Sequence, residues 1–151
     1  MANSSEAISM AGRITDDLKD AVMRPIRGFI DAMDARTFES AKRFFVDQPS
    51  IVDAFAPYHW TGVTAIERWA TGVEAAIARS TILDYSAEVL GIRTIVIEGN
   101  RAYASIDLCY TLKMSDQKQP VLDKGVFTYA LERSVDGWKI AAATWAGGVT
   151  I

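Results

Sequence analysis

A single aspartate in a short apolar segment is the residue of this chain best suited to chemistry. Asp53 follows Ile51 and Val52, and it lies nine residues before Gly62. A carboxylate in apolar surroundings costs free energy unless it is satisfied or used. Loss of water raises its pKa, which suits it to act as a general base near neutral pH. The alternative is a structural role, in which Asp53 caps a loop or accepts backbone N–H groups.

The segment after Asp53 carries the only histidine of the chain, His59, between Tyr58 and Trp60. Histidine is the side chain whose unperturbed pKa lies near 7. His59 could pair with Asp53 or with a substrate at the mouth of a pocket, and a solvent-facing position is the alternative. The two aromatic neighbours could gate such a pocket or fill it as core, because aromatic side chains bury large areas.

A further acid or base is available on the segment 101–114, which alternates with period two. We expect its apolar face to meet the helices or a pocket. That face carries Ala102, Ala104, Ile106, Leu108, Tyr110 and Leu112. If the opposite face turned inward, Asp107 would be the reserve acid or base. No pattern around Cys109 supports a nucleophile.

The composition excludes several classes of function. The 151 residues carry a net charge of −3, one cysteine and one histidine. Nucleic-acid binding needs a basic surface, and a structural zinc site needs more sulfur or imidazole ligands. We find no glycine-rich phosphate loop and no membrane span. We therefore expect no cofactor, no metal and a cytoplasmic location.

The periodicity predicts one α+β domain over residues 13–151, after a flexible N-terminus of residues 1–12. Helices are expected over 14–33, 37–46 and 62–78, and Pro25 is expected to kink or break the first of them. A short strand, 51–55, and a loop, 57–60, separate the second helix from the third. Four strands follow, over 84–98, 101–114, 124–134 and 137–146, with an expected bulge near Gly91.

Alternation in the last two strands assigns their faces. Phe127, Tyr129 and Leu131 share one face, and Trp138, Ile140, Ala142 and Thr144 are expected to share another. Trp145 would then lie opposite Thr144. The predicted architecture is an antiparallel sheet with three helices covering one face.

The order of these elements resembles the NTF2-like superfamily, and most closely its SnoaL-like and ketosteroid-isomerase-like branch. The resemblance spans roughly residues 22–146. It is carried by FIDAMDARTF (29–38), IVD (51–53), WTGVTAI (60–66), NRAY (100–103), GVFTYALER (125–133) and DGWKI (136–140). It implies a cone-shaped, cystatin-like fold around an apolar pocket, and a homodimer joined through a sheet face.

The resemblance also implies roles for individual residues. The isomerases use an aspartate nine residues before the glycine that opens the third helix, and Asp53 matches it. Their oxyanion-binding tyrosine corresponds to Phe29 here, and their oxyanion-binding aspartate to Tyr129 or a neighbouring residue. Phe29 cannot donate a hydrogen bond, which argues against steroid isomerisation by that mechanism.

The resulting hypothesis is a small-molecule pocket protein, and possible reactions are those of a cofactor-free isomerase, cyclase or dehydratase. Its ligand would be small and apolar or would contain a carbonyl group. The expected catalytic residues are Asp53, His59 and Tyr129. The expected ligand-binding residues are Phe29, Met33, Phe55, Tyr58, Trp60, Trp69 and Phe127. The alternative is a non-catalytic ligand-binding or dimeric interaction module of the same fold.

Overall fold

The computed structural model describes residues 15–148. The expected flexible N-terminus, residues 1–12, lies outside this range. The described elements are α2 (Asp16–Asp34), the 3-10 helix η1 (Phe38–Phe44), β1 (Phe45–Val52), β2 (His59–Thr61), α3 (Ala65–Ala78), β3 (Ile82–Glu98), β4 (Arg101–Met114), β5 (Val121–Ser134) and β6 (Gly137–Gly147). Helices and strands follow the mixed α+β order expected from the sequence.

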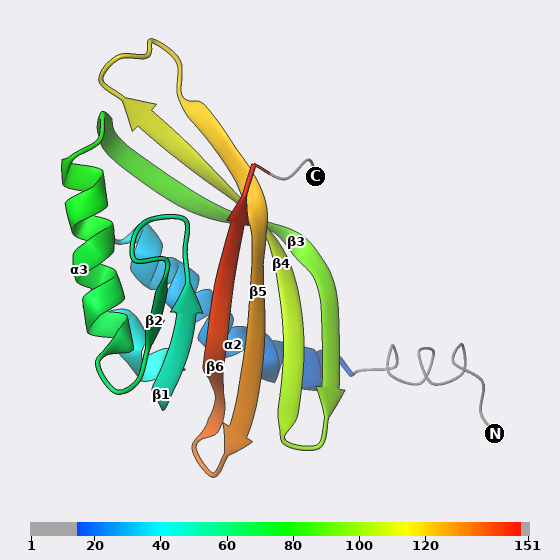
Figure 1. Cartoon of the computed structure of the whole chain (residues 1–151). Helices are drawn as coiled ribbons and strands as arrows, with labels where there is room; N and C mark the ends of the chain where they lie inside the picture. The colour runs from blue at the N-terminus through cyan, green and yellow to red at the C-terminus, as the bar shows by residue number, and fades with distance from the viewer. Residues whose placement is uncertain (1–14, 149–151) are drawn as a thin grey trace.

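The strands of residues 15–148 form one six-stranded sheet in the order β2-β1-β6-β5-β4-β3. Figure 1 shows α2 crossing behind the strands, with α3 beyond the β1–β2 edge. The expectation of a purely antiparallel sheet is wrong, because β1 pairs parallel with β6. The connection from β1 to the meander passes through α3, and such a crossover can bring the chain back in the parallel sense.

Helix α2 continues through Pro25, so the predicted interruption of the helix at this proline does not occur. Thr15 caps the helix, its hydroxyl oxygen accepting a hydrogen bond from the Leu18 N–H at 3.3 Å. A proline inside a helix costs about 3 kcal/mol. One buried stripe runs along both halves and offsets that cost; it includes Val22, Ile26, Phe29, Ile30 and Met33.

The second predicted helix is shorter and tighter than expected, and the first strand is longer. η1 is a 3-10 helix that ends at Phe44, so Val46 already belongs to β1. The Ser40 hydroxyl donates to the Thr37 carbonyl oxygen at 2.6 Å, one of the local side-chain bonds that compete with α-helix. Close packing fixes η1 on α2, because a Cβ atom at Gly28 would clash with the Phe44 ring.

Register shifts within the sheet decide which side chains face the helices. The bulge expected near Gly91 is confirmed by the register shift between Val89 and Gly91. An unexpected shift passes over Ala141 in β6, where Leu131 pairs with Ile140 and Ala130 with Ala142. A one-residue shift exchanges the two faces of a strand. The predicted common face of Trp138, Ile140, Ala142 and Thr144 is therefore wrong, and Trp145 joins the inner face.

A cluster of aromatic rings forms the core between α2 and the sheet. The Phe29 ring centroid lies 5.2 Å from that of Phe45 and 5.5 Å from that of Phe127, both in edge-to-face geometry. Trp69 of α3 joins them at 5.6 Å from Phe29. These side chains are at most 2% exposed. The cluster fixes α3 relative to β1, and this places the end of β1 beside Trp69.

Candidate functional site

Asp53 lies directly after β1, at the start of a tight turn that leads to β2. The turn is closed by the Asp53 N–H, which donates to the Tyr58 carbonyl oxygen at 3.1 Å. The carboxylate accepts two further hydrogen bonds, from the Ala54 N–H to Oδ1 at 2.7 Å and from the Trp69 indole N–H to Oδ2 at 2.9 Å. Asp53 is half-buried. The side chain is therefore held in one orientation by the core.

Burial raises the pKa of the Asp53 carboxyl above its usual range, while the hydrogen bonds from Trp69 and Ala54 act in the opposite direction. Desolvation disfavours the charged form, and donors to the carboxylate favour it. The net upward shift makes Asp53 a better proton acceptor than an exposed aspartate.

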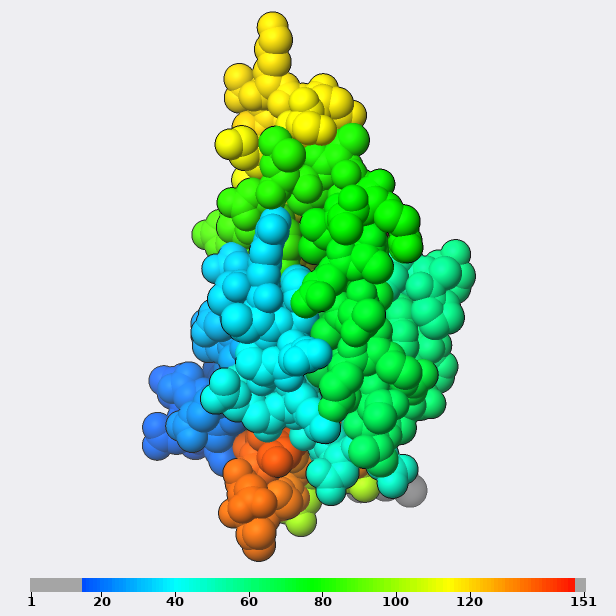
Figure 2. All heavy atoms as spheres, turned by 90° about the vertical axis from the view of Figure 1, so that its left-hand side faces the viewer, coloured from blue at the N-terminus to red at the C-terminus, as the bar shows by residue number. Residues whose placement is uncertain are grey.

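A cavity of about 180 Å³ adjoins Asp53, between α3, the α2–η1 junction and the inner face of the sheet. Figure 2 looks onto the side of the molecule where α3 meets the α2–η1 segment. Asp53 is the only charged residue among the described residues of the lining. Apolar and aromatic side chains make up most of the rest: Met33, Phe38, Phe55, Trp69, Val73, Ala76, Ile77, Ile82, Tyr85, Tyr110, Leu112 and Trp145.

Two tyrosines of this lining differ in the hydrogen bonds that their hydroxyl groups make. The Tyr85 hydroxyl donates to the Met33 carbonyl oxygen at 2.5 Å, and that of Tyr110 reaches the Met33 sulfur at 3.5 Å. Thioether sulfur is a weak acceptor. Burial first, and then the nearby Asp53 carboxylate, raises the pKa of Tyr110 well above its usual range. Tyr110 is therefore a neutral donor that a ligand oxygen could engage.

Tyr129 lies in the core rather than in this cavity. It is fully buried, and its ring stacks on Phe127 at 5.4 Å and meets Phe29 at 6.1 Å. Its hydroxyl has no hydrogen-bond partner within the described chain. Neither Tyr129 nor Phe29 lines the cavity, so the structure does not bring the two oxyanion-hole positions of the resemblance to Asp53.

His59 is also separate from Asp53. It is exposed on β2, and its Nε2 lies 2.9 Å from the Ser50 hydroxyl. His59 pairs with Val52 across the β1–β2 ladder, whereas Ile51 points into the core. Alternation therefore places His59 on the outer side of the sheet.

The remaining predicted ligand-binding residues divide into three groups. Met33, Phe55 and Trp69 line the cavity. Trp60 and Phe127 are buried in the core, and Tyr58 is 60% exposed. Sequence reasoning missed Tyr85, Tyr110 and Trp145 as lining residues. The alternation of β4 already predicted that Tyr110 faces inward. The bulge at Ala141 exchanges the two faces of β6, so simple alternation assigned Trp145 to the wrong face.

Asp107, the reserve acid or base, and Cys109 lie on the outer face of β4. The Asp107 carboxylate pairs with the Arg93 guanidinium at 2.9 Å, and Cys109 is a buried free thiol. Across residues 15–148, no group of three or more His, Cys, Asp or Glu side chains could hold a metal ion. In the same part of the chain, no helix is long and apolar enough to cross a membrane.

Comparison with solved structures identifies the fold. An NTF2-like superfamily protein from Salmonella enterica has a TM-score of 0.70 and 18% identity, with 91% of this chain and 95% of that chain covered. A hexachlorocyclohexane dehydrochlorinase, LinA-type3 from Novosphingobium barchaimii, has a TM-score of 0.70 and 13% identity, with 87% and 86% covered. A protein from Novosphingobium aromaticivorans, provisionally assigned as a scytalone dehydratase, has a TM-score of 0.69 and 15% identity, with 88% and 85% covered.

The chain therefore has the NTF2-like fold, which the resemblance in its sequence implied. No family model and no curated protein sequence matches the chain.

Proposed function

We propose that this protein is a cofactor-free enzyme of the SnoaL-like kind, in which Asp53 removes a proton from a small carbonyl compound. The observation that carries the proposal is a carboxyl group with a raised pKa on the wall of an apolar cavity that Tyr110 also lines. A base with a raised pKa takes up a proton more readily near neutral pH. Apolar walls suit a ligand of low polarity.

In this mechanism the Asp53 carboxylate takes a proton from the carbon next to the carbonyl group. The electrons of that C–H bond move into the carbonyl system, and the Tyr110 hydroxyl donates a hydrogen bond to the oxygen on which negative charge develops. Tyr110 thus replaces the donors expected from the sequence, Tyr129 and His59. The intermediate then either regains a proton at another carbon, which is isomerisation, or expels a group from the neighbouring carbon.

Expulsion of a leaving group is the reaction type that the comparisons favour. Two of the similar structures are named as a dehydrochlorinase and, provisionally, a dehydratase, and both names describe eliminations. The inward-facing Trp69 supports either course, because its indole N–H fixes the Asp53 carboxylate that must receive the proton. Orientation of the base is a large part of general-base catalysis.

A non-catalytic binding module is the second candidate. Both Asp53 oxygens already accept hydrogen bonds, which is also what a purely structural aspartate does. In that case the cavity would hold a ligand without turnover.

A homodimer and a cytoplasmic location stay predictions from the sequence. The outer face of β5 and β6 would be the dimer surface, since small uncharged side chains follow one another there. They are Thr128, Ala130, Ala142 and Thr144.

Proton abstraction can be measured without knowing the natural substrate. We expect the protein to accelerate deuterium uptake from D₂O at the α-carbons of cyclohexanone or 2-indanone, followed by NMR. Asp53→Asn should lower this rate by about 100-fold or more, the usual contribution of a general base. Asp107→Asn is the matched control, because it removes a carboxylate outside the cavity. Wild-type protein that binds these ketones without exchanging their protons would instead identify a binding module.

A further inference from the structure

Arg36 occupies a backbone position that favours glycine. It follows the C-cap of α2 and has a φ of 58°. Its N–H donates to the Met33 carbonyl oxygen at 3.0 Å, and the Thr37 N–H donates to the Ala32 carbonyl oxygen at 2.9 Å. This way of ending a helix calls for a left-handed residue, and glycine adopts that conformation most readily. The arginine side chain must therefore be explained by its contacts.

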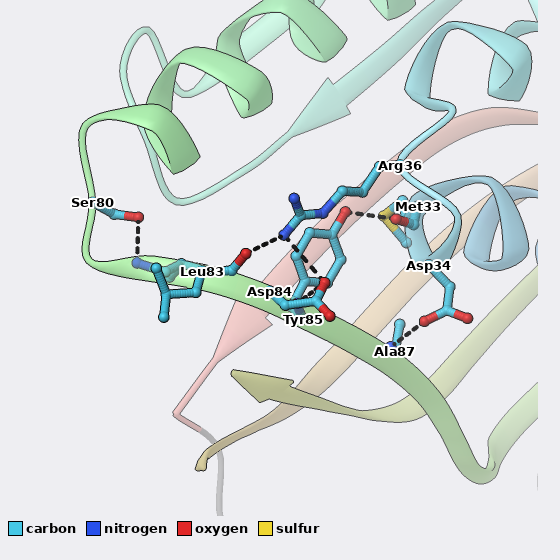
Figure 3. A network of polar contacts seen from close by, with 9 residues as sticks. Met33, Asp34, Arg36, Ser80, Leu83, Asp84, Tyr85 and Ala87 are labelled. Carbon is cyan, nitrogen blue, oxygen red and sulfur yellow. Dashed lines mark hydrogen bonds and ion pairs between the residues drawn. The ribbon is translucent and has the colours of Figure 1, made fainter. Parts of the chain in front are cut away.

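Those contacts use only one of the three guanidinium nitrogens for polar interactions within the described residues. Figure 3 shows Arg36 reaching across Tyr85 toward the start of β3. The guanidinium carbon lies 5.1 Å from the Tyr85 ring centroid. One nitrogen, Nη2, makes both polar contacts, at 3.4 Å from the Leu83 carbonyl oxygen and 3.4 Å from Asp84 Oδ1. Within residues 15–148 the other two nitrogens have no acceptor.

The attachment of α2 to β3 does not depend on Arg36. The Tyr85 hydroxyl bonds the Met33 carbonyl oxygen at 2.5 Å, and the Ala87 N–H bonds Asp34 Oδ1 at 2.9 Å (Figure 3). The Asp84 side chain is 72% exposed, and exposed ion pairs contribute little to stability. A purely structural role thus accounts poorly for an arginine at this position.

Arg36 lines a second hollow that shares lining residues with the Asp53 cavity. This hollow of about 280 Å³ is lined by Arg36, Phe38, Glu74, Ile77 and Ala78. Phe38 and Ile77 also line the Asp53 cavity, as does the Tyr85 ring beneath the guanidinium. The two hollows therefore have part of their walls in common, and Arg36 is the one cation among the described residues that line them.

The charges of the combined site divide it into two parts. Asp53 repels an anionic group from the inner cavity, whose other lining residues are uncharged. Arg36 attracts such a group to the outer hollow, where its planar guanidinium can bind a carboxylate through two parallel hydrogen bonds. Glu74 also lines the outer hollow, where its negative charge opposes the attraction by Arg36, but no ion pair joins the two side chains.

We propose that the substrate is a carboxylate-bearing carbonyl compound, whose apolar body and carbonyl group occupy the Asp53 cavity while its carboxylate binds Arg36 at the entrance. This inference rests on the proposed function of the same cavity. Arg36 is then the residue that determines specificity, and its weak contact with Asp84 is exchanged for the substrate carboxylate.

Two ligands of nearly identical shape test the proposal. 4-Oxocyclohexanecarboxylate and 4-oxocyclohexanecarboxamide both carry a ketone on the same ring, and only the first is charged. Calorimetric titration of the wild-type protein should show the carboxylate binding about tenfold more tightly, as expected for a charge-assisted hydrogen-bonded pair. Added salt should reduce this preference.

Variants at position 36 separate binding from folding. Arg36→Gly should abolish the preference while leaving the melting temperature equal or higher, because glycine suits the backbone conformation. Arg36→Lys should keep part of the preference. Arg27→Gln removes the same charge from an exposed position of α2 and should leave the preference intact. Equal affinity for both ligands in the wild type, or a preference that survives Arg36→Gly, would overturn the proposal.

The two proposals fail in different ways. If Asp53→Asn leaves the deuterium uptake of the ketone acid unchanged, the catalytic role of Asp53 is wrong, and a carboxylate preference that depends on Arg36 still supports the binding role of Arg36. If Asp53→Asn abolishes uptake while Arg36→Gly changes neither affinity nor rate, the catalytic proposal stands and the assignment of the substrate class is wrong.

Discussion

The inner face of the sheet has a filled end and an open end, although the same strands form both. At the filled end Tyr129 stacks on Phe127 beneath Phe29, and all three are at most 1% exposed. At the open end Tyr110 and Trp145 meet edge to face at 5.1 Å beside a cavity of about 180 Å³. Residue type does not distinguish the two ends, since both consist of inward aromatic side chains.

The difference lies in what covers each end. Phe29 of α2 lies over Phe127 and Tyr129, whereas the Tyr110 ring meets Tyr85 of β3 edge to face and its hydroxyl contacts the Met33 sulfur. Trp69 belongs to both ends, because its ring packs on Phe29 and its indole N–H bonds Asp53. The comparison teaches that a core position and a site position can share one strand pattern, and that the helix above them decides which results.

The largest effect is expected at the filled end. Phe29→Ala should lower the free energy of unfolding by about 3–5 kcal/mol, because a fully buried ring is replaced by a void. Ile77→Ala at the open end, where the side chain already borders a cavity, should cost only about 1 kcal/mol. Urea unfolding of both variants measures this. Equal losses would mean that the two ends are packed alike.

A smaller effect on stability, of opposite sign, is expected when the Tyr129 hydroxyl, which has no partner among the described residues, is removed. Tyr129→Phe should leave stability unchanged or raise it by about 1 kcal/mol, because a buried hydroxyl without a partner is costly. Tyr110→Phe, which loses only a contact to sulfur, should change stability by less than about 0.5 kcal/mol and yet weaken ketone exchange. A marked loss of stability in Tyr129→Phe would reveal a bound water or another acceptor at the filled end.

The smallest effect is the pH dependence that Asp53 contributes. Its pKa is raised in the folded protein, because burial outweighs the opposing hydrogen bonds from Trp69 and Ala54. Between the unfolded and folded pKa values the folded protein holds a proton that the unfolded chain has released, so stability falls as pH rises through this window. Melting temperatures from pH 3 to 8 should therefore decline less steeply above the unfolded pKa in Asp53→Asn. Identical pH profiles for the wild type and Asp53→Asn would show that Asp53 does not contribute to this pH dependence.

Much of the fold follows from periodicity, and its errors have identifiable causes. The free energy gained by burying the apolar stripe of α2 outweighs the cost of the proline inside the helix. A rule that considers only Pro25 and its neighbours does not include this gain. The four-strand meander was predictable because turn signals such as Asp136-Gly137 separate alternating segments. β2 was not, since its three residues are too few to show a period.

The candidate site was predictable only in part. Asp53 was identified because a carboxylate after an apolar strand is costly, a property visible in the sequence. Trp145 could not be assigned, because the extra residue Ala141 reverses the faces of β6. Arg36 could not be found either, since nothing in the pattern around it reveals a left-handed backbone or the ring of Tyr85 beneath its guanidinium.

The indole of Trp69 gives the protein an optical sensor of its own. Of the four tryptophans in the sequence, Trp69 and Trp145 line the cavity, while Trp60 and Trp138 are buried elsewhere. Protonation of the carboxylate that accepts the Trp69 N–H, or arrival of a molecule between the two rings, changes the surroundings of these fluorophores directly. Emission from the unlabelled protein can therefore follow both the proton on Asp53 and the occupancy of the cavity in one titration.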